Sequence, residues 1–292
     1  MITLKDLAYV RVGTQDMQSQ LRFAQEIVGL ELVAVEGSTA YLRADDRHHC
    51  LAFVEGEAIG TLASAFVLAN SVALDAAAEQ LEGEGLSVHR GTPDEARARR
   101  VQQFISFTTP SGNPIELVVG QTHLESRPVR FARPAGITEF GHIGIEAPDV
   151  ASAEEFWVRN FNIQVSDRIG ENASLTRFDE VHHKLAIFKD VTNLGHVNFQ
   201  VASIDDLMRS WRFLQHHDVK ITMGPGRHPQ STAIFLYFEG PEEMTWEYSY
   251  GVRLIPEDEE WIPRTFDPSE PDFIDMWRGA LPSTPSLPEA GA

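Results

Sequence analysis

The stretch HHKLAIF, residues 182–188, has a near copy in HHCLAFV, residues 48–54. Two adjacent histidines before an apolar, strand-like run are improbable twice in one chain by chance. The repeat therefore indicates an internal duplication with an offset of 134 residues, 182 minus 48. Neighbouring segments follow in the same order with small changes in loop length: LAYVRVG pairs with FGHIGIE, SAFVLANSVALDA with GHVNFQVASIDDL, and PSGNPIELVVG with PEEMTWEYSYG.

Each half divides once more. A strand-like segment near Tyr9, Ala65, His142 or His196 is followed by a stretch with helical periodicity and then by short strands. In the first helix Gly29 provides a stop, and in the last one Ser203 can act as the N-cap. The pattern predicts an α+β fold of four βαβββ modules in two tandem domains, each with an open, barrel-like sheet.

Composition places the domain boundaries. We expect an N-terminal domain over residues 1–122, a linker over 123–137 that is rich in proline and arginine, and a C-terminal domain over 138–252. The remaining residues, 253–292, form an acidic and proline-rich extension. Its last ~12 residues have the composition of a disordered tail.

Charge and cysteine content limit the function. The 292 residues carry a net charge of −19, which repels nucleic acids and anionic membranes, and no apolar run approaches the roughly 20 residues of a membrane span. Cys50 is the only cysteine, so no disulfide framework is expected. With no leader-like segment at its start, the chain is expected to be cytoplasmic and to bind a small ligand or a metal.

Three residues of the second half lie at equivalent strand positions: His142, His196 and Glu247. Strand alternation turns His142 away from the isoleucines that flank it. One such histidine alone is usually a core or surface residue, but three converging side chains would form a 2-His-1-carboxylate site with open positions for reactants. The first half has Tyr9, Ala65 and Glu116 at the aligned positions. These cannot form that site, so Glu116 and His49 are interpreted as relics.

These motifs resemble the type I extradiol ring-cleavage dioxygenases of the vicinal oxygen chelate superfamily, which include the 2,3-dihydroxybiphenyl and catechol 2,3-dioxygenases. The resemblance spans about residues 5 to 250, with GHIGIE, GHVNFQV and WEYSYG as the three ligand strands. It implies His142, His196 and Glu247 as ligands of Fe(II), or of Mn(II), in the second domain alone. It also implies O2 as cosubstrate, a catecholic substrate and a homo-oligomer.

The resemblance extends to three catalytic residues. The second histidine of the HH pair, His183, matches the family's acid–base residue beside the oxygen-binding position. In GPGRHPQSTAIFLYFEGP, His228 and Tyr237 match the histidine and tyrosine that contact the catecholic oxygens. The chain departs from the family at Pro229, Gln230 and Ser231, where a Thr-Asn-Asp run is common. Contacts to ring substituents are therefore expected to differ here.

Alternation along HHKLAIF predicts that His183 shares a strand face with Leu185 and Ile187, with His182 on the other face. Histidines elsewhere, His89, His123, His216 and His217, are assigned no role. Two alternatives stay open. A glyoxalase-like lyase or isomerase of the same superfamily would need a further carboxylate or glutamine ligand, and a non-enzymatic small-molecule-binding protein would need a cavity without metal ligands.

Overall fold

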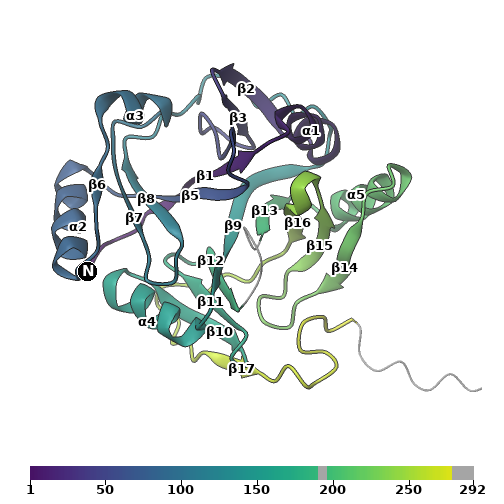
Figure 1. The fold of residues 1–292 in the computed structure, drawn as a ribbon. Helices are drawn as coiled ribbons and strands as arrows, with labels where there is room; N and C mark the ends of the chain where they lie inside the picture. The colour runs from purple at the N-terminus through teal and green to yellow at the C-terminus, as the bar shows by residue number, and fades with distance from the viewer. Residues whose placement is uncertain (190–195, 278–292) are drawn as a thin grey trace, which may run out of the picture.

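A computed structural model describes residues 1–189 and 196–277 of the chain. Two large sheets form the framework (Figure 1). The first has the order β2-β3-β4-β1-β5-β8-β7-β6, with strands Asp6–Thr14 (β1), Glu31–Glu36 (β2), Thr39–Arg43 (β3), Leu51–Glu55 (β4), Gly60–Val67 (β5), His89–Arg90 (β6), Gln103–Thr108 (β7) and Pro114–Val119 (β8).

The second sheet has the order β14-β15-β16-β13-β9-β12-β11-β10-β17. Its strands are Ile137–Ala147 (β9), Gln164–Ile169 (β10), Ala173–Arg177 (β11), Leu185–Lys189 (β12), His196–Val201 (β13), Ile221–Arg227 (β14), Ile234–Glu239 (β15), Thr245–Tyr250 (β16) and Arg264–Phe266 (β17). Among the described residues neither sheet closes into a barrel.

The four predicted βαβββ modules are confirmed by the order of the elements. Helical segments follow the first strand of each module, and Figure 1 shows α2, α4 and α5 on the outside of the sheets. The helical segments are Met17–Arg22 (α1), Phe23–Val28 (η1), Ser71–Gly83 (α2), Pro93–Ala98 (α3), Val150–Asn160 (α4), Ile204–His216 (α5) and Pro241–Glu243 (η2).

Local sequence signals explain where these helices begin and end. The side chain of Ser203 accepts a hydrogen bond from the backbone N–H of Asp206, as an N-cap residue does. Gly29 ends η1, which continues α1, in the left-handed conformation with φ +99°, which a glycine adopts without strain. Both predicted helix ends are therefore confirmed.

The middle of the second sheet separates an apolar face from a polar one. β9 and β13 are antiparallel neighbours, and each is flanked by a parallel strand, β12 beside β9 and β16 beside β13. Ile143, Val197 and Trp246 are fully buried in the hydrophobic core. Because side chains alternate along a strand, the residue next to each of these in the same strand faces the opposite side of the sheet.

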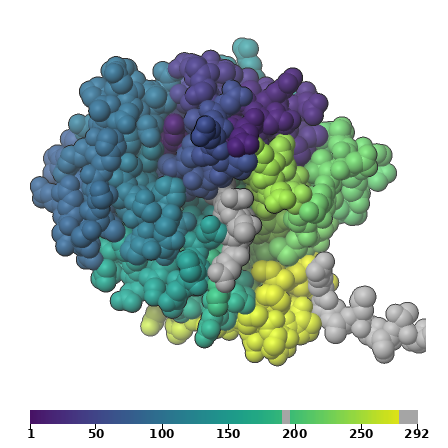
Figure 2. Space-filling model, in the orientation of Figure 1, coloured from purple at the N-terminus to yellow at the C-terminus, as the bar shows by residue number. Residues whose placement is uncertain are grey.

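The described part of the C-terminal segment packs against the second sheet. Residues 264–266 pair in parallel with β10 at the edge of the second sheet, and the yellow segment lies against the teal and green surface in Figure 2. The predicted disordered tail lies outside the described residues, and the predicted domain boundaries stay predictions. No helix in the described ranges is long and apolar enough to cross a bilayer.

Candidate metal centre

His142, His196 and Glu247 meet on the polar face of the central strands. They come from β9, β13 and β16, which are adjacent in the sheet. His142 Nε2 lies 2.8 Å from His196 Nε2, and Glu247 Oε2 lies 3.0 Å and 3.2 Å from these two nitrogens. All three side chains are buried, and among the described residues they are the group whose donor atoms could hold a metal ion.

The electrostatics of this group favour a cation. Burial alone raises the pKa of Glu247, but the two imidazoles outweigh it and hold that pKa well below 4.5. Burial lowers the pKa of His142 to about 4, so its ring is neutral near pH 7. Among the described residues no hydrogen-bond donor is directed at Glu247 Oε2. A buried carboxylate oxygen that lies 3.0 Å and 3.2 Å from two imidazole nitrogens is the environment that a divalent metal would complete.

Gly144 makes room for the His196 side chain. It lies opposite His196 in the β9–β13 pair. A Cβ at this position would stand 2.9 Å from His196 Nδ1 and 3.0 Å from a ring carbon of Phe188. The second glycine in GHIGIE, Gly144, is therefore needed for the close approach of the His196 ring to the sheet backbone.

His183 lies on the other side of His142, with the two ring centroids 4.3 Å apart. The predicted strand face was wrong, because β12 begins at Leu185 and the HH pair precedes it. Leu185 and Ile187 are buried in the core, whereas the chain bends before them and directs His183 to the polar face. Burial holds the pKa of His183 well below 6.5, so this imidazole is neutral and can accept a proton.

His228 and Tyr237 lie on the β15 side of the triad. The Tyr237 hydroxyl lies 3.2 Å from His228 Nε2, and its ring centroid is 5.3 Å from that of His196. His228 Nδ1 lies 2.8 Å from the carbonyl oxygen of Ile274, which can only accept, so Nδ1 carries the proton. Burial and the nearby Glu247 carboxylate raise the pKa of Tyr237 well above 10, so its hydroxyl keeps its proton.

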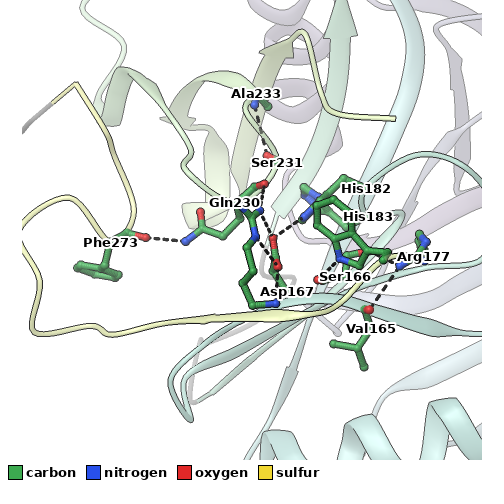
Figure 3. Close-up of polar contacts among 12 residues, drawn as sticks. Val165, Ser166, Asp167, Arg177, His182, His183, Gln230, Ser231, Ala233 and Phe273 are labelled. Atoms are coloured by element: carbon green, nitrogen blue, oxygen red, sulfur yellow. Dashed lines mark hydrogen bonds and ion pairs between the residues drawn. The ribbon is translucent and has the colours of Figure 1, made fainter. Parts of the chain in front are cut away.

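Two of the three residues that depart from the family pattern, Gln230 and Ser231, hold the C-terminal segment. Gln230 Nε2 donates to the carbonyl oxygen of Phe273 at 2.5 Å, as Figure 3 shows, and the Gln230 carbonyl accepts from Arg264 at 2.7 Å. The backbone N–H of Arg253 donates to the Ser231 carbonyl. Gln230 and Ser231 are buried by these contacts.

The equivalent position in the first half contains no such group. Tyr9 donates to Glu116 Oε2 at 2.7 Å, and Arg99 donates to Glu116 Oε1 at 2.8 Å, so this carboxylate is neutralised by an arginine. Its buried contacts give Glu116 a structural role that the sequence did not predict.

One alignment was also wrong. In the β1–β5 pair Arg11 lies opposite Ala63, just as Gly144 lies opposite His196 in the β9–β13 pair. Ala63, and not Ala65, is therefore the counterpart of His196. Arg11 takes the place of Gly144, and burial together with the nearby Arg99 lowers its pKa.

Two residues near His183 were not predicted from the sequence. Asp167 Oδ2 lies 2.9 Å from His182 Nε2, and Arg264 Nη2 donates to the same oxygen at 2.5 Å. Both carboxylate and histidine are fully buried. Asp167 lies in a strand that also contains Ser166 and Arg168, and nothing in this polar run distinguishes a buried carboxylate from a surface one.

Comparison with known proteins gives a match over both halves. The family model described as Glyoxalase/Bleomycin resistance protein/Dioxygenase superfamily matches residues 6–117 and 139–248. A 1,2-dihydroxynaphthalene dioxygenase of Sphingobium xenophagum is 24% identical over 280 residues, which cover 90% of this chain and 94% of that protein.

An iron-dependent extradiol dioxygenase of Rhodococcus jostii (strain RHA1) is 27% identical over 297 residues, with 94% and 97% of the two chains covered. The crystal structure of BphC, a halotolerant catechol dioxygenase, superposes with a TM-score of 0.86 at 24% identity, covering 99% of this chain and 98% of that one. The predicted resemblance to the extradiol dioxygenases and the predicted fold class are confirmed.

Proposed function

We propose that this chain, which belongs to the Glyoxalase/Bleomycin resistance protein/Dioxygenase superfamily, is an extradiol dioxygenase that cleaves a catechol-type ring with O2. Its metal would be held by His142, His196 and Glu247. The observation that carries the proposal is the buried Glu247 oxygen that lies 3.0 Å and 3.2 Å from two imidazole nitrogens and receives no hydrogen bond from the described residues.

The contrast between the two halves supports the proposal. In the first half Glu116 is paired with Arg99, which supplies a positive charge permanently. In the second half the carboxylate is paired with two buried imidazoles, and burial lowers the pKa of His142 to about 4. Two neutral ligands and one anionic ligand leave a divalent metal with net positive charge, which suits a catecholate.

A bound metal would lower the pKa of a coordinated hydroxyl and so favour the catecholate form of the substrate. The chain's own residues would then handle the protons. His183, neutral and beside His142, is placed to accept the proton of the substrate hydroxyl. Tyr237 keeps its proton and can donate a hydrogen bond, while His228 orients that hydroxyl through Nε2.

The metal is proposed to be Fe(II), with Mn(II) as the alternative, because the same ligands suit both ions. The substrate would belong to the catechols consumed in the breakdown of aromatic compounds. The cytoplasmic location and the homo-oligomer predicted from the sequence stay predictions.

The proposal is tested by oxygen uptake with catechol and substituted catechols, using metal-free protein loaded separately with Fe(II) and Mn(II). Formation of a yellow ring-cleavage product in step with oxygen uptake is expected with at least one metal. His142→Ala, His196→Ala and Glu247→Ala should each abolish metal retention and turnover while the far-UV circular dichroism stays unchanged. Stoichiometric metal in all three variants would contradict the assignment.

The same experiment separates the two alternatives. Retained metal without oxygen uptake, together with turnover of a hemithioacetal, would favour a glyoxalase-like lyase. Binding of an aromatic ligand by metal-free protein, with no metal taken up at any pH between about 6 and 8, would favour a non-enzymatic binding protein, because neutral imidazoles are free to ligate in this range.

A further inference from the structure

A chain of polar side chains extends behind His183, buried as far as Asp167, and reaches Arg264 in the C-terminal segment (Figure 3). His183 Nδ1 lies 3.1 Å from His182 Nδ1, and His182 Nε2 lies 2.9 Å from Asp167 Oδ2. Arg264 of β17 closes the chain, since its backbone N–H and Nε donate to Asp167 Oδ1 and its Nη2 donates to Oδ2. Four side chains therefore connect the edge of the sheet with the candidate metal centre.

The donors and acceptors of this chain permit one placement of the protons. Burial raises the pKa of Asp167, but the hydrogen bonds from His182 and Arg264 outweigh it and hold that pKa below 3.8, so the group is an acceptor only. His182 must then carry its proton on Nε2. Burial lowers the pKa of His182 and keeps the ring neutral, so its Nδ1 has a lone pair.

These proton positions fix the direction of the hydrogen bond between the two histidines. Because His182 Nδ1 can only accept, the nitrogen 3.1 Å away, His183 Nδ1, must be the donor. A neutral imidazole has a single N–H, so the basic nitrogen of His183 is Nε2. That nitrogen belongs to the ring that lies against His142.

The first half provides an internal comparison. His48 Nδ1 and His49 Nδ1 are 3.3 Å apart, so the paired geometry of the two histidines is kept there. In the β2–β3 pair Ala34 lies opposite Tyr41, directly after a bulge, and Asp167 occupies the same place opposite Leu175 in the β10–β11 pair. Ala34 is therefore the counterpart of Asp167. The half that lacks the metal ligands also lacks the carboxylate.

Arg264 is held firmly by the C-terminal segment. Its guanidinium lies over the rings of Trp261 and Phe266, at 5.2 Å and 5.0 Å from their centroids, and donates to the Gln230 carbonyl. Trp261 Nε1 in turn donates to the Ser166 carbonyl at 2.6 Å. The positive charge that keeps Asp167 ionised is thus fixed by several contacts and does not depend on one flexible side chain.

We propose that Asp167, held by Arg264, is a positioning residue that acts through His182 to fix the tautomer of His183 and leave Nε2 as its proton acceptor. The inference rests on the proposed function in so far as His183 is the proton-accepting residue. It assigns a task to the segment after residue 253, which is to set the proton position in the site.

The test is Asp167→Asn in the full-length protein. Two Arg264 donors face Oδ1 and only Nη2 faces Oδ2, so the amide oxygen should stay on the Oδ1 side. The amide nitrogen then takes the place of Oδ2, displaces Arg264 Nη2 and donates to His182 Nε2. Both histidines should then reverse their tautomers, with His183 protonated on Nε2. Nitrogen-15 NMR of the histidine rings in metal-free protein measures this directly, without turnover.

Kinetics give the second measurement. With metal bound, Asp167→Asn should lower kcat by ~10–100-fold, the range for losing an outer hydrogen-bond partner of a site, with metal content and the KM for the best catechol little changed. Glu154→Gln is the matched control, because Glu154 forms an ion pair with Arg168, the next residue of β10, and does not contact His182. It should leave kcat and the ring tautomers as in the wild type.

Arg264→Gln serves as a second variant should Asp167→Asn not fold, and a smaller tautomer change in the same direction is expected. An unchanged His183 tautomer in the folded Asp167 variant, or in Arg264→Gln when only that variant folds, would overturn the proposal. So would a wild-type His183 protonated on Nε2. If metal-loaded wild type failed to cleave any catechol while the tautomers reversed as expected, the proposed function would fail and the positioning of His183 by Asp167 would stand.

Discussion

Replacing the equivalent glutamate in each half should separate structure from metal binding. Glu116→Gln and Glu247→Gln are the same chemical change at corresponding strand positions. Glu116 is 3% exposed and its partner Arg99 is 17% exposed, so solvent screens this ion pair only slightly. We expect Glu116→Gln to lower stability and leave metal binding intact. Glu247→Gln should weaken metal binding and leave stability intact.

The magnitude for Glu116→Gln follows from its hydrogen bonds. The glutamine oxygen can keep the bond from Arg99, and its amide nitrogen can face the Tyr9 oxygen, so the main loss is the charge. Hydrogen bonds to charged groups contribute ~1.5–3 kcal/mol against ~0.5–1.5 kcal/mol for neutral ones, which gives a loss of roughly 1–2 kcal/mol. At ~2–4 °C per kcal/mol, Tm should fall by roughly 2–8 °C.

Glu247→Gln removes the proposed anionic ligand of the metal. Losing a hydrogen-bond partner outside the ligand sphere already costs ~10–100-fold in metal affinity, so a loss of at least ~100-fold is expected here. Thermal unfolding of the metal-free proteins, with metal content measured after dialysis by mass spectrometry, reports both quantities. Loss of metal in Glu116→Gln at an unchanged Tm would refute the assignment of the two carboxylates.

Further predictions concern the two histidine pairs, the sheet and the acid stability. His183→Gln should retain metal but lower kcat by ~10²–10⁴-fold, whereas His49→Gln should leave kcat close to wild type when both are assayed on one catechol. Gly144→Ala should weaken metal binding without unfolding the chain, because its Cβ would crowd His196 at 2.9 Å; a normal dissociation constant would contradict this. Burial raises the pKa of Glu31, but hydrogen bonds from the backbone and from arginines hold it below 4.5. Its stabilisation is therefore present above pH ~4.5 and is lost as the pH falls through the folded-state pKa, so Glu31→Gln should destabilise at pH 7 by ~3 kcal/mol and converge with wild type in acid, as urea unfolding would show.

Much of the fold could be read from the sequence, because each module repeats the same alternation of strand and helix signals. The apolar alternation around His142 and His196 places both rings away from the core, and the repeated HH peptide reveals the duplication. These are local patterns, which side-chain direction in a strand makes visible without knowledge of neighbours.

Strand register was decided only by the tertiary structure. Ala63 and Ala65 lie two residues apart, and a shift of two residues keeps a side chain on the same face of a strand. The alternation pattern therefore could not distinguish them, and only the pairing of β1 with β5 shows that Ala63 is the counterpart of His196. The bend that turns His183 away from the core face of β12 is likewise invisible in the apolar pattern.

The contacts of the C-terminal segment are the clearest example of a feature that only the tertiary structure decides. Asp167 and Arg264 are 97 residues apart, and β17 is a strand of three residues, too short to show any periodicity. Its composition, acidic and rich in proline, is typical of an exposed tail. An ion pair between distant residues is specified by the packing of the whole domain, since a charged side chain has the same sequence signal whether it faces water or a buried partner.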